Sequence, residues 1–196
     1  ISTGAGVDTI TSGSGADTIT IGAGTDNEVI LSTAAFGGSA KDTITDYVAA
    51  NLNLEIDLSE MDGTLIDLDA ATTNAGAGTF VAATITGAYD LGSASAGTNL
   101  VIVNLTGNVA DSSALETAFE IGGSAALTAD GQIDVGDSFL ASYSDGTHSY
   151  LAEVLVGVTT LDNGKFGIGS LIATDLVQFS DISDVTDVVV ASMELI

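Results

Sequence analysis

The 196-residue chain has no cysteine, no proline, no tryptophan and no arginine, and its single histidine is His148. The absence of cysteine excludes disulfides and thiolate metal sites. The His-Glu-x-x-His zinc motif, the Gly-x-Ser-x-Gly nucleophile motif and a phosphate-binding loop are missing as well. His148 follows a turn sequence, a position typical of an exposed strand edge. We therefore expect no catalytic residue and predict that the chain is not an enzyme.

Long apolar runs and basic residues are also scarce. No run of 18 apolar residues occurs, so we predict no transmembrane segment. No signal-peptide pattern is present and the chain opens within a repeat at Ile1, so we expect it to be the end of a longer polypeptide. Only Lys41 and Lys165 oppose 27 Asp and Glu residues, and the formal net charge is −25. We predict no nucleic-acid binding, because phosphate contacts require a basic surface.

The chain combines this acidity with apolar character. Its mean hydropathy of +0.46 distinguishes it from a disordered acidic tail. Carboxylates at this density repel one another in a compact fold and attract divalent cations. We therefore predict that bound cations stabilise the fold, by about 2.7 kcal/mol per site at 100 times the dissociation constant.

Three glycine-aspartate blocks recur every nine residues at the start of the chain. They read Gly4-Ala-Gly6-Val-Asp8, Gly13-Ser-Gly15-Ala-Asp17 and Gly22-Ala-Gly24-Thr-Asp26. A Thr-Ile-Thr segment follows each of the first two blocks, and this alternation predicts short strands with Ile10 and Ile19 in the core. A fixed short period indicates one structural unit stacked on itself.

The blocks resemble the calcium-binding nonapeptide of RTX proteins, Gly-Gly-x-Gly-x-Asp-x-apolar-x, which winds into a parallel β-roll. A closing block, Gly37-Gly38-Ser-Ala-Lys-Asp42-Thr-Ile44-Thr-Asp46-Tyr47, and the segment Ile56-Asp57-Leu58-Ser59 extend the resemblance. The resemblance implies a roll over residues 1–47 and makes calcium the expected cofactor. Its implied ligand residues are Gly4, Gly6, Asp8, Gly13, Gly15, Asp17, Gly22, Gly24, Asp26, Asp42 and Asp46.

In this family two nonapeptides make one coil, so the resemblance implies that Asp8 and Asp26 share one edge and that Asp17 lies on the other. We expect one well-formed site near Asp8 and Asp26. We expect incomplete sites at Asp17, because Ala35 stands two repeats later where an aspartate is needed, and at Asp42. Glu28 stands where an apolar residue belongs, so we expect Val29 to take the core position through a bulge.

Residues 48–196 are predicted to form a β-rich solenoid or sandwich domain, which makes the whole chain all-β with at most one or two short helices. Strand patterns cover residues 53–58, 79–86, 100–105, 138–144, 147–156 and 175–179. The helix is predicted over Ser112–Ile121, with Asp111 or Ser112 as the N-cap and Gly122-Gly123 as the stop. Asp145-Gly146 predicts a two-residue hairpin turn.

Two further segments have open interpretations. The cluster Asp130-Gly-Gln-Ile-Asp134-Val-Gly-Asp137 is either a turn into the next strand or a second calcium site without EF-hand spacing. The tail, about residues 180–196, alternates acidic and aliphatic residues and resembles the C-terminal export signal of bacterial type I secretion substrates. An ordinary terminal strand would have the same pattern.

Two functions fit these observations best. The first is a non-catalytic, calcium-binding structural protein, secreted or on the bacterial cell surface: a surface-layer, matrix or filament subunit that is exported by type I secretion and self-associates through calcium. The alternative is the C-terminal, calcium-triggered folding and export module of a larger secreted enzyme, toxin or adhesin. A lyase or hydrolase that uses the acidic residues is a weaker third, since four tyrosines and six phenylalanines are few for sugar stacking.

Overall fold

The computed structural model is rich in β-strands and has a single α-helix among the residues that it describes. These residues are 1–13, 15–24, 26–31, 41–48, 52–56, 64–65, 79–91, 99–128, 135–158, 161–162, 164–188 and 193–195. The strands are β1 (Thr9–Thr11), β2 (Thr18–Ile19), β3 (Asn27–Leu31), β4 (Asp42–Ile44), β5 (Leu52–Ile56), β6 (Thr64–Leu65), β7 (Thr79–Ile85), β8 (Tyr89–Asp90), β9 (Asn99–Asn108), β10 (Leu127–Thr128), β11 (Asp137–Ser144), β12 (Ser149–Val156), β13 (Leu161–Asp162), β14 (Lys165–Phe166), β15 (Leu171–Phe179) and β16 (Met193–Leu195). The helix is α1 (Ser112–Phe119), and a 3-10 turn, η4, spans Val185–Asp187. The prediction of an all-β chain with at most one or two short helices is confirmed at this level.

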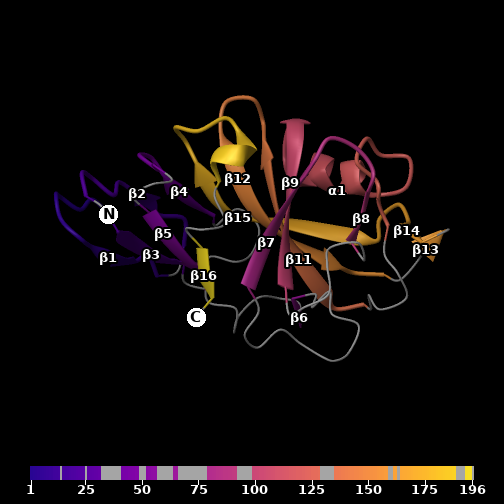
Figure 1. Ribbon diagram of the computed structural model, residues 1–196, viewed down its shortest axis with the longest axis horizontal. Coiled ribbons are helices and arrows are strands. Elements are labelled where there is room, and N and C mark those ends of the chain that lie inside the picture. The colour runs from indigo at the N-terminus through magenta and orange to yellow at the C-terminus, as the bar shows by residue number, and fades with distance from the viewer. Residues whose placement is uncertain are drawn as a thin grey trace.

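The strands that follow the glycine-aspartate blocks alternate between two sheets. In one sheet β1 pairs in parallel with β3, β3 with β5, and β5 with β16. In the other, β2 pairs in parallel with β4, and β4 with β15. Strands β1 to β5 lie together at the N-terminal end of the molecule (Figure 1). The chain thus returns to the same sheet at every second strand.

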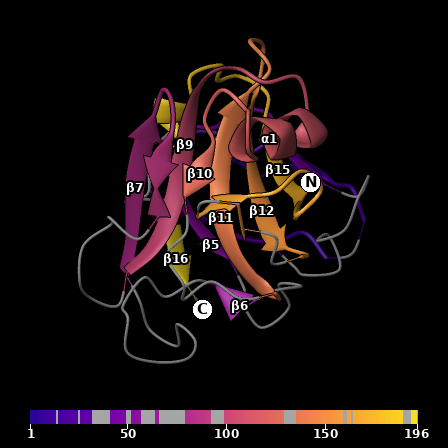
Figure 2. The ribbon, with the colours of Figure 1, turned by 90° about the vertical axis from the view of Figure 1, so that its right-hand side faces the viewer.

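The second sheet continues into the rest of the molecule as an eight-stranded sheet. Its main order is β2-β4-β15-β12-β11-β9-β7, and β6 pairs with β11. The β11–β12 and β12–β15 pairs are antiparallel, whereas β9 is parallel to both β11 and β7, so the sheet is mixed. Figure 2 shows β7 at one margin of the ribbon. The finer prediction of a solenoid or sandwich, and the division of the chain at residue 47, stay predictions.

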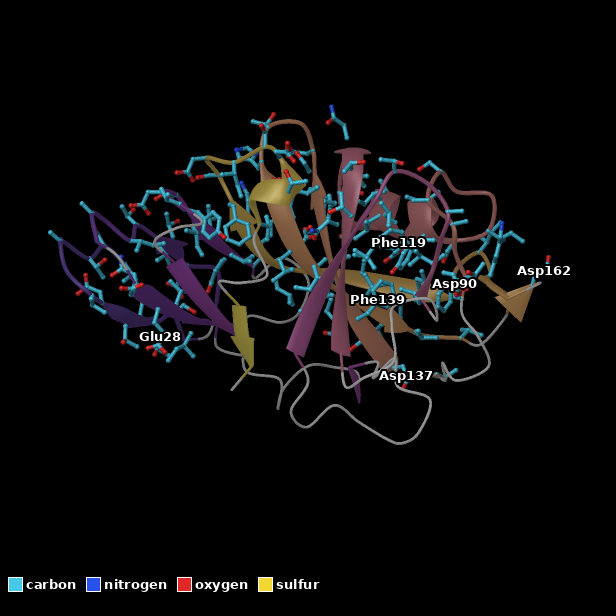
Figure 3. The ribbon with its side chains drawn as sticks, in the orientation of Figure 1. Glu28, Asp90, Phe119, Asp137, Phe139 and Asp162 are labelled. Carbon is cyan, nitrogen blue, oxygen red and sulfur yellow. The ribbon has the colours of Figure 1, made fainter. Side chains whose placement is uncertain are left out.

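Helix α1 forms where the sequence predicts it. The Asp111 side chain accepts a hydrogen bond from the Ala114 N–H, and Gly122 has a φ of +84° just past the helix end. Leu115, Ala118 and Phe119 are buried, as expected. The Phe119 ring lies 6.0 Å from that of Phe139 on β11, and both rings lie in the core beneath the helix (Figure 3). This packing joins α1 to the large sheet.

The β11–β12 hairpin is confirmed, but its turn is longer than predicted. Ser144 pairs with Ser149, so four residues connect the strands instead of two. Asp145 accounts for the difference, because its Oδ1 accepts the N–H groups of Thr147 and His148 at 2.7 Å each. A side chain that bonds to the backbone in this way stabilises a wider turn than Asp-Gly alone predicts.

Candidate metal centre

The first and third glycine blocks are stacked directly on one another. A Cβ placed on Gly22 would lie 2.3 Å from the Gly4 carbonyl oxygen, and one on Gly24 would lie 1.9 Å from the Gly6 carbonyl oxygen. No side chain fits in these spaces, so glycine is required at both positions. The carbonyl oxygens of the first turn therefore face the third turn at close range. The predicted pairing of every second block is observed for these glycines.

Asp8 lies at the end of the first turn, and one of its carboxylate oxygens has no hydrogen-bond partner among the described residues. Its N–H donates to Oδ1 of Asn27 at 2.8 Å, and its carboxylate Oδ2 is buried without a hydrogen-bond partner among the described residues. Asn27 is completely buried. A buried carboxylate oxygen without a donor carries a desolvation cost that a cation would remove.

Asn27, rather than Asp26, is the residue stacked on Asp8. Thr9 pairs with Glu28, so the two strands are offset by one residue more than two full repeats. Asp26 is exposed and has a φ of +60°, as an extra residue in the turn. The same shift brings Val29 into the core, as expected: Val29 pairs with Ile10 and is fully buried. The expected bulge is not observed, because the β1–β3 register is regular and the extra residue lies in the turn. Our sequence reasoning missed Asn27, although Glu28 at an apolar position was the signal for the shift.

Asp17 and Asp42 are brought together on the other sheet. The Asp17 N–H donates to Oδ1 of Asp42 at 2.9 Å, and Thr18 pairs with Thr43. We expected Asp17 to lack a partner because Ala35 stands two repeats later. In the structure β2 pairs with β4 instead, and β4 brings Asp42 to Asp17. Residues 32–40 of the intervening connection, including Ala35 and the predicted glycines Gly37 and Gly38, lie outside the described residues.

Asp42 is fully buried, and like Asp8 it has a carboxylate oxygen without a hydrogen-bond partner among the described residues. Its Oδ2 and the Ser12 hydroxyl are both buried without a hydrogen-bond partner in the described part of the chain. Burial raises the pKa of Asp42; the hydrogen bond from the Asp17 N–H opposes this rise, and the Asp17 charge adds to it. A positive ion beside this carboxylate would favour its charged form.

Asp46 has a structural role that the sequence did not reveal. Its Oδ1 accepts the Ile21 N–H at 2.6 Å and its Oδ2 accepts the Gly22 N–H at 2.7 Å. Both oxygens of this predicted ligand thus already hold the start of the third turn. Gly13 and Gly15 in the second turn have φ values of +84° and +105°, and an added Cβ would meet nothing within 4 Å at either. Their positive φ values allow the tight curl of that turn, and an added Cβ would meet no stacked turn in the described structure.

The oxygen atoms at these turns are suitable ligands for a hard cation, but they are few. Backbone carbonyls and carboxylates are the oxygens that calcium prefers. Within the described residues no group of three or more Asp, Glu or His side chains gathers as a metal site. Figure 3 shows how widely the acids are spread, with Glu28 at one end of the molecule and Asp162 at the other. A calcium ion here would depend on the turn carbonyls together with Asp8, or with the Asp17–Asp42 pair.

The other predicted sites have less to offer. Residues 130–134 of the second acidic cluster lie outside the described residues, and Asp137 begins β11. His148 is half-buried, and its Nδ1 lies 3.5 Å from the Asp145 carboxylate in the hairpin turn. No nucleophile is placed beside it among the interactions of the described residues.

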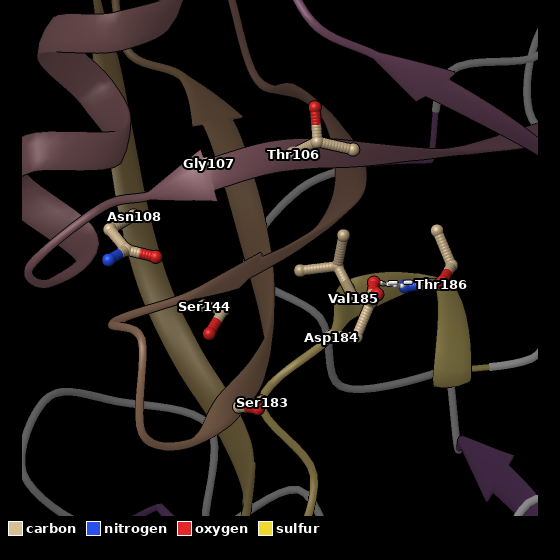
Figure 4. Close-up of a pocket in the computed structure, with 8 residues that line it drawn as sticks. All are labelled: Thr106, Gly107, Asn108, Ser144, Ser183, Asp184, Val185 and Thr186. Atoms are coloured by element: carbon tan, nitrogen blue, oxygen red, sulfur yellow. Dashed lines mark hydrogen bonds between the residues drawn. The ribbon is translucent and has the colours of Figure 1, made fainter.

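A pocket of about 350 Å³ lies between the ends of β9 and β11 and the segment around η4 (Figure 4). Hydroxyl and amide side chains line most of it, and Asp184 is its single carboxylate. Oδ1 of Asp184 accepts the N–H and hydroxyl of Thr186, so it caps η4. The Asp184 carboxylate and the Thr186 hydroxyl therefore already have a structural role in this cap.

The comparisons with known proteins do not add a relative: no family model, no curated protein and no solved structure matches the chain. Among the described helices none has the length and apolar character needed to cross a membrane.

Proposed function

We propose that the stacked glycine-aspartate turns bind calcium and that the chain is a calcium-dependent, secreted or cell-surface structural module. The observation that carries the proposal is the contact between the first and third turns. Their glycines leave no space for side chains, backbone carbonyl oxygens face the neighbouring turn, and Oδ2 of Asp8 is buried there without a partner among the described residues. Carbonyl and carboxylate oxygens are the ligands that calcium prefers.

The parallel ladders at the N-terminal end support the RTX-like β-roll that this proposal includes. Strands from successive blocks enter opposite sheets, and Ile10, Ile19, Val29 and Ile44 are all buried. The residues that would hold calcium are Asp8 with the turn carbonyls on one edge and Asp17 with Asp42 on the other. Bound calcium would supply positive charge between carboxylates that otherwise repel one another at a net charge of −25.

A structural role, such as a surface-layer, matrix or filament subunit exported by type I secretion, is favoured over the alternative of an export and folding module. The large mixed sheet and α1 form a core of their own, which an export segment alone does not need. In this role calcium also joins neighbouring copies by neutralising their acidic faces. The proposal includes no enzymatic role.

The proposal is tested by calcium titration of the purified chain, with thermal unfolding and isothermal calorimetry as readouts and magnesium as the comparison ion. The unfolding temperature should rise with calcium and not with magnesium. Asp8→Asn should weaken this response strongly, because it removes the charge on the buried oxygen. Asp26→Asn is the matched control, since Asp26 is exposed, and it should weaken the response less.

Light scattering of the same samples tests the self-association through calcium. Particles that grow with calcium and dissolve with chelator support the structural role, whereas a folded monomer at every calcium concentration favours the export-module alternative. A chain that unfolds at the same temperature with calcium, magnesium or chelator would remove the metal proposal itself.

A further inference from the structure

The far edge of the large sheet, away from the glycine-aspartate turns, carries a second feature. Strand β7 (Thr79–Ile85) pairs with β9 along its whole length, from Thr79 opposite Asn99 to Ile85 opposite Leu105. It ends the strand order, and in the described structure no strand pairs with its other side. Figure 2 shows β7 at the margin of the ribbon with β9 on its inner side. Such an edge exposes a row of backbone N–H and C=O groups.

Natural edge strands are usually protected from pairing by charges, proline or shortness. Strand β7 has the sequence Thr-Phe-Val-Ala-Ala-Thr-Ile, with seven residues and no charge, proline or glycine. It combines β-branched and aromatic residues with neutrality, which is the composition that favours strand-to-strand association. The edge is therefore competent to pair and carries none of these protective residues.

The distribution of charge indicates which partner the edge accepts. Between residues 71 and 110 the only charged residue is Asp90, in a chain of 27 Asp and Glu residues. A basic partner would be attracted to the acidic remainder of the chain and not to this segment. A second copy, which carries the same charge of −25, meets the least repulsion along this neutral edge.

We propose that β7 pairs antiparallel with β7 of a second copy, so that the large sheet continues across a twofold axis. Identical edges that pair in this way form a closed, isologous dimer. An axis at Ala82, the middle residue, pairs all seven residues of each strand and places alanine, a small residue, at the point where the two strands cross the axis. This interface needs no calcium and is separate from the turns that hold Asp8.

The absence of cysteine makes a direct test possible, because any introduced cysteine is unique. In the proposed register the two copies of residue 82 are directly opposite, with Cα atoms about 4.5–5.5 Å apart, which is within the range for a disulfide. Ala82→Cys should therefore give a covalent dimer on mild oxidation. Ile172→Cys is the control, since Ile172 is 49 % exposed on β15 within the sheet, and that variant should give no covalent dimer.

Sedimentation velocity over a range of concentrations, in calcium, gives the second readout. The parent chain should show a reversible monomer–dimer equilibrium. Thr84→Lys, which places a charge at an exposed position of β7, should shift this equilibrium to monomer by tenfold or more in the dissociation constant, while Ile172→Lys should not. The unchanged circular dichroism of both variants would show that each remains folded.

The outcomes also separate this inference from the calcium proposal. Asp8→Asn should keep the dimer even where it loses its calcium response. A parent chain that is monomeric at all concentrations, or equal cross-linking of the Ala82→Cys and Ile172→Cys variants, would overturn the β7 interface and leave calcium binding untouched. Higher assemblies that dissolve with chelator while a dimer persists would support both.

Discussion

Gly24 lies so close to Gly6 that a Cβ on Gly24 would be 1.9 Å from the Gly6 carbonyl oxygen. The obstructing atom belongs to the backbone of the stacked turn, so no rotamer change can relieve the contact. The carbonyl group of the first block therefore determines which residue the third block can have at this position. Stacking of the turns therefore depends on glycine at position 24.

Gly24→Ala should destabilise the stack, with a loss of about 1–3 kcal/mol in the free energy of unfolding, as for overpacked sites. It should also reduce the stabilisation by calcium, because the turn carbonyls are displaced. Gly4→Ala is the control: a Cβ on Gly4 meets nothing within 4 Å, and its φ is not in the left-handed region. That variant should be neutral or slightly stabilising in urea unfolding. Equal losses in the two variants would contradict the stacking argument.

The hairpin carboxylate Asp145 should make the fold sensitive to acid. Burial acts to raise its pKa, but hydrogen bonds from the His148 N–H, the Tyr150 hydroxyl and the Thr147 N–H prevail and lower it to about 2. A lowered folded-state pKa stabilises the fold above 3.8, and this stability is lost as the pH falls from 3.8 towards 2. Asp145→Asn should abolish this contribution. Urea unfolding of both proteins above pH 3.8 and near pH 2 should show a difference that shrinks with acid.

Lys41 should contribute to stability far more than its half-exposed position indicates. Its Nζ lies 3.0 Å from Oδ2 of Asp175, a side chain 8 % exposed, and 4.9 Å from the centre of the Tyr150 ring. Lys41→Met leaves Asp175 with the Tyr143 hydroxyl, at 2.7 Å, as the remaining side-chain donor in the described network. The expected loss is about 1–3 kcal/mol in the free energy of unfolding.

Lys165→Met provides the matched control for this prediction, because it removes the same charge from β14. It should cost less. In a double-mutant cycle, Lys41→Met should have a smaller effect in an Asp175→Asn background, since the buried charge is then absent. Additive effects in the cycle would show that the ion pair is not the source of the loss.

Glu116 should stabilise β15, because its side chain accepts a hydrogen bond from the β15 backbone as a neighbouring strand would. Its Oε1 accepts the Ala173 N–H at 2.7 Å, and Oε1 of Glu120, one turn later, accepts the Leu171 N–H at 3.2 Å. Glu116→Ala should cost about 1.5–3 kcal/mol in thermal unfolding, because a charge-assisted hydrogen bond is lost. Glu116→Gln keeps an acceptor and should recover part of the loss. Faster amide exchange at Ala173 in the alanine variant, measured by NMR, would locate the effect.

Local patterns predicted a large part of this architecture. The Thr-Ile-Thr alternation placed Ile10 and Ile19 in the core, where both are buried, and the misplaced Glu28 predicted that Val29 takes the next core position. Helix α1 followed from its cap and apolar spacing, and the hairpin from two alternating segments around Asp145. These features depend on residues within a few positions of one another, and so a single sequence contains the information for them.

The partners of the polar side chains were not predictable in the same way. Asp17 meets Asp42 rather than the residue two repeats on, because the intervening connection sets the register. Asp46 bonds to the third turn, and Asn27 replaces Asp26 beside Asp8, through shifts of one or a few residues. A strand offset of one residue changes which side chains meet, and no local pattern specifies that offset.

The β-rich class, the position of the helix, the glycine-dependent turns and an acidity that favours cations could all be inferred from the sequence alone. These follow from backbone preferences and charge, which each residue brings with it. The fold was needed to show that Lys41 contacts Asp175 from a distant part of the chain, that α1 supplies carboxylates to β15, and that β7 ends the strand order of the described sheet. Such relationships arise from the packing of distant strands, which depends on the core as a whole.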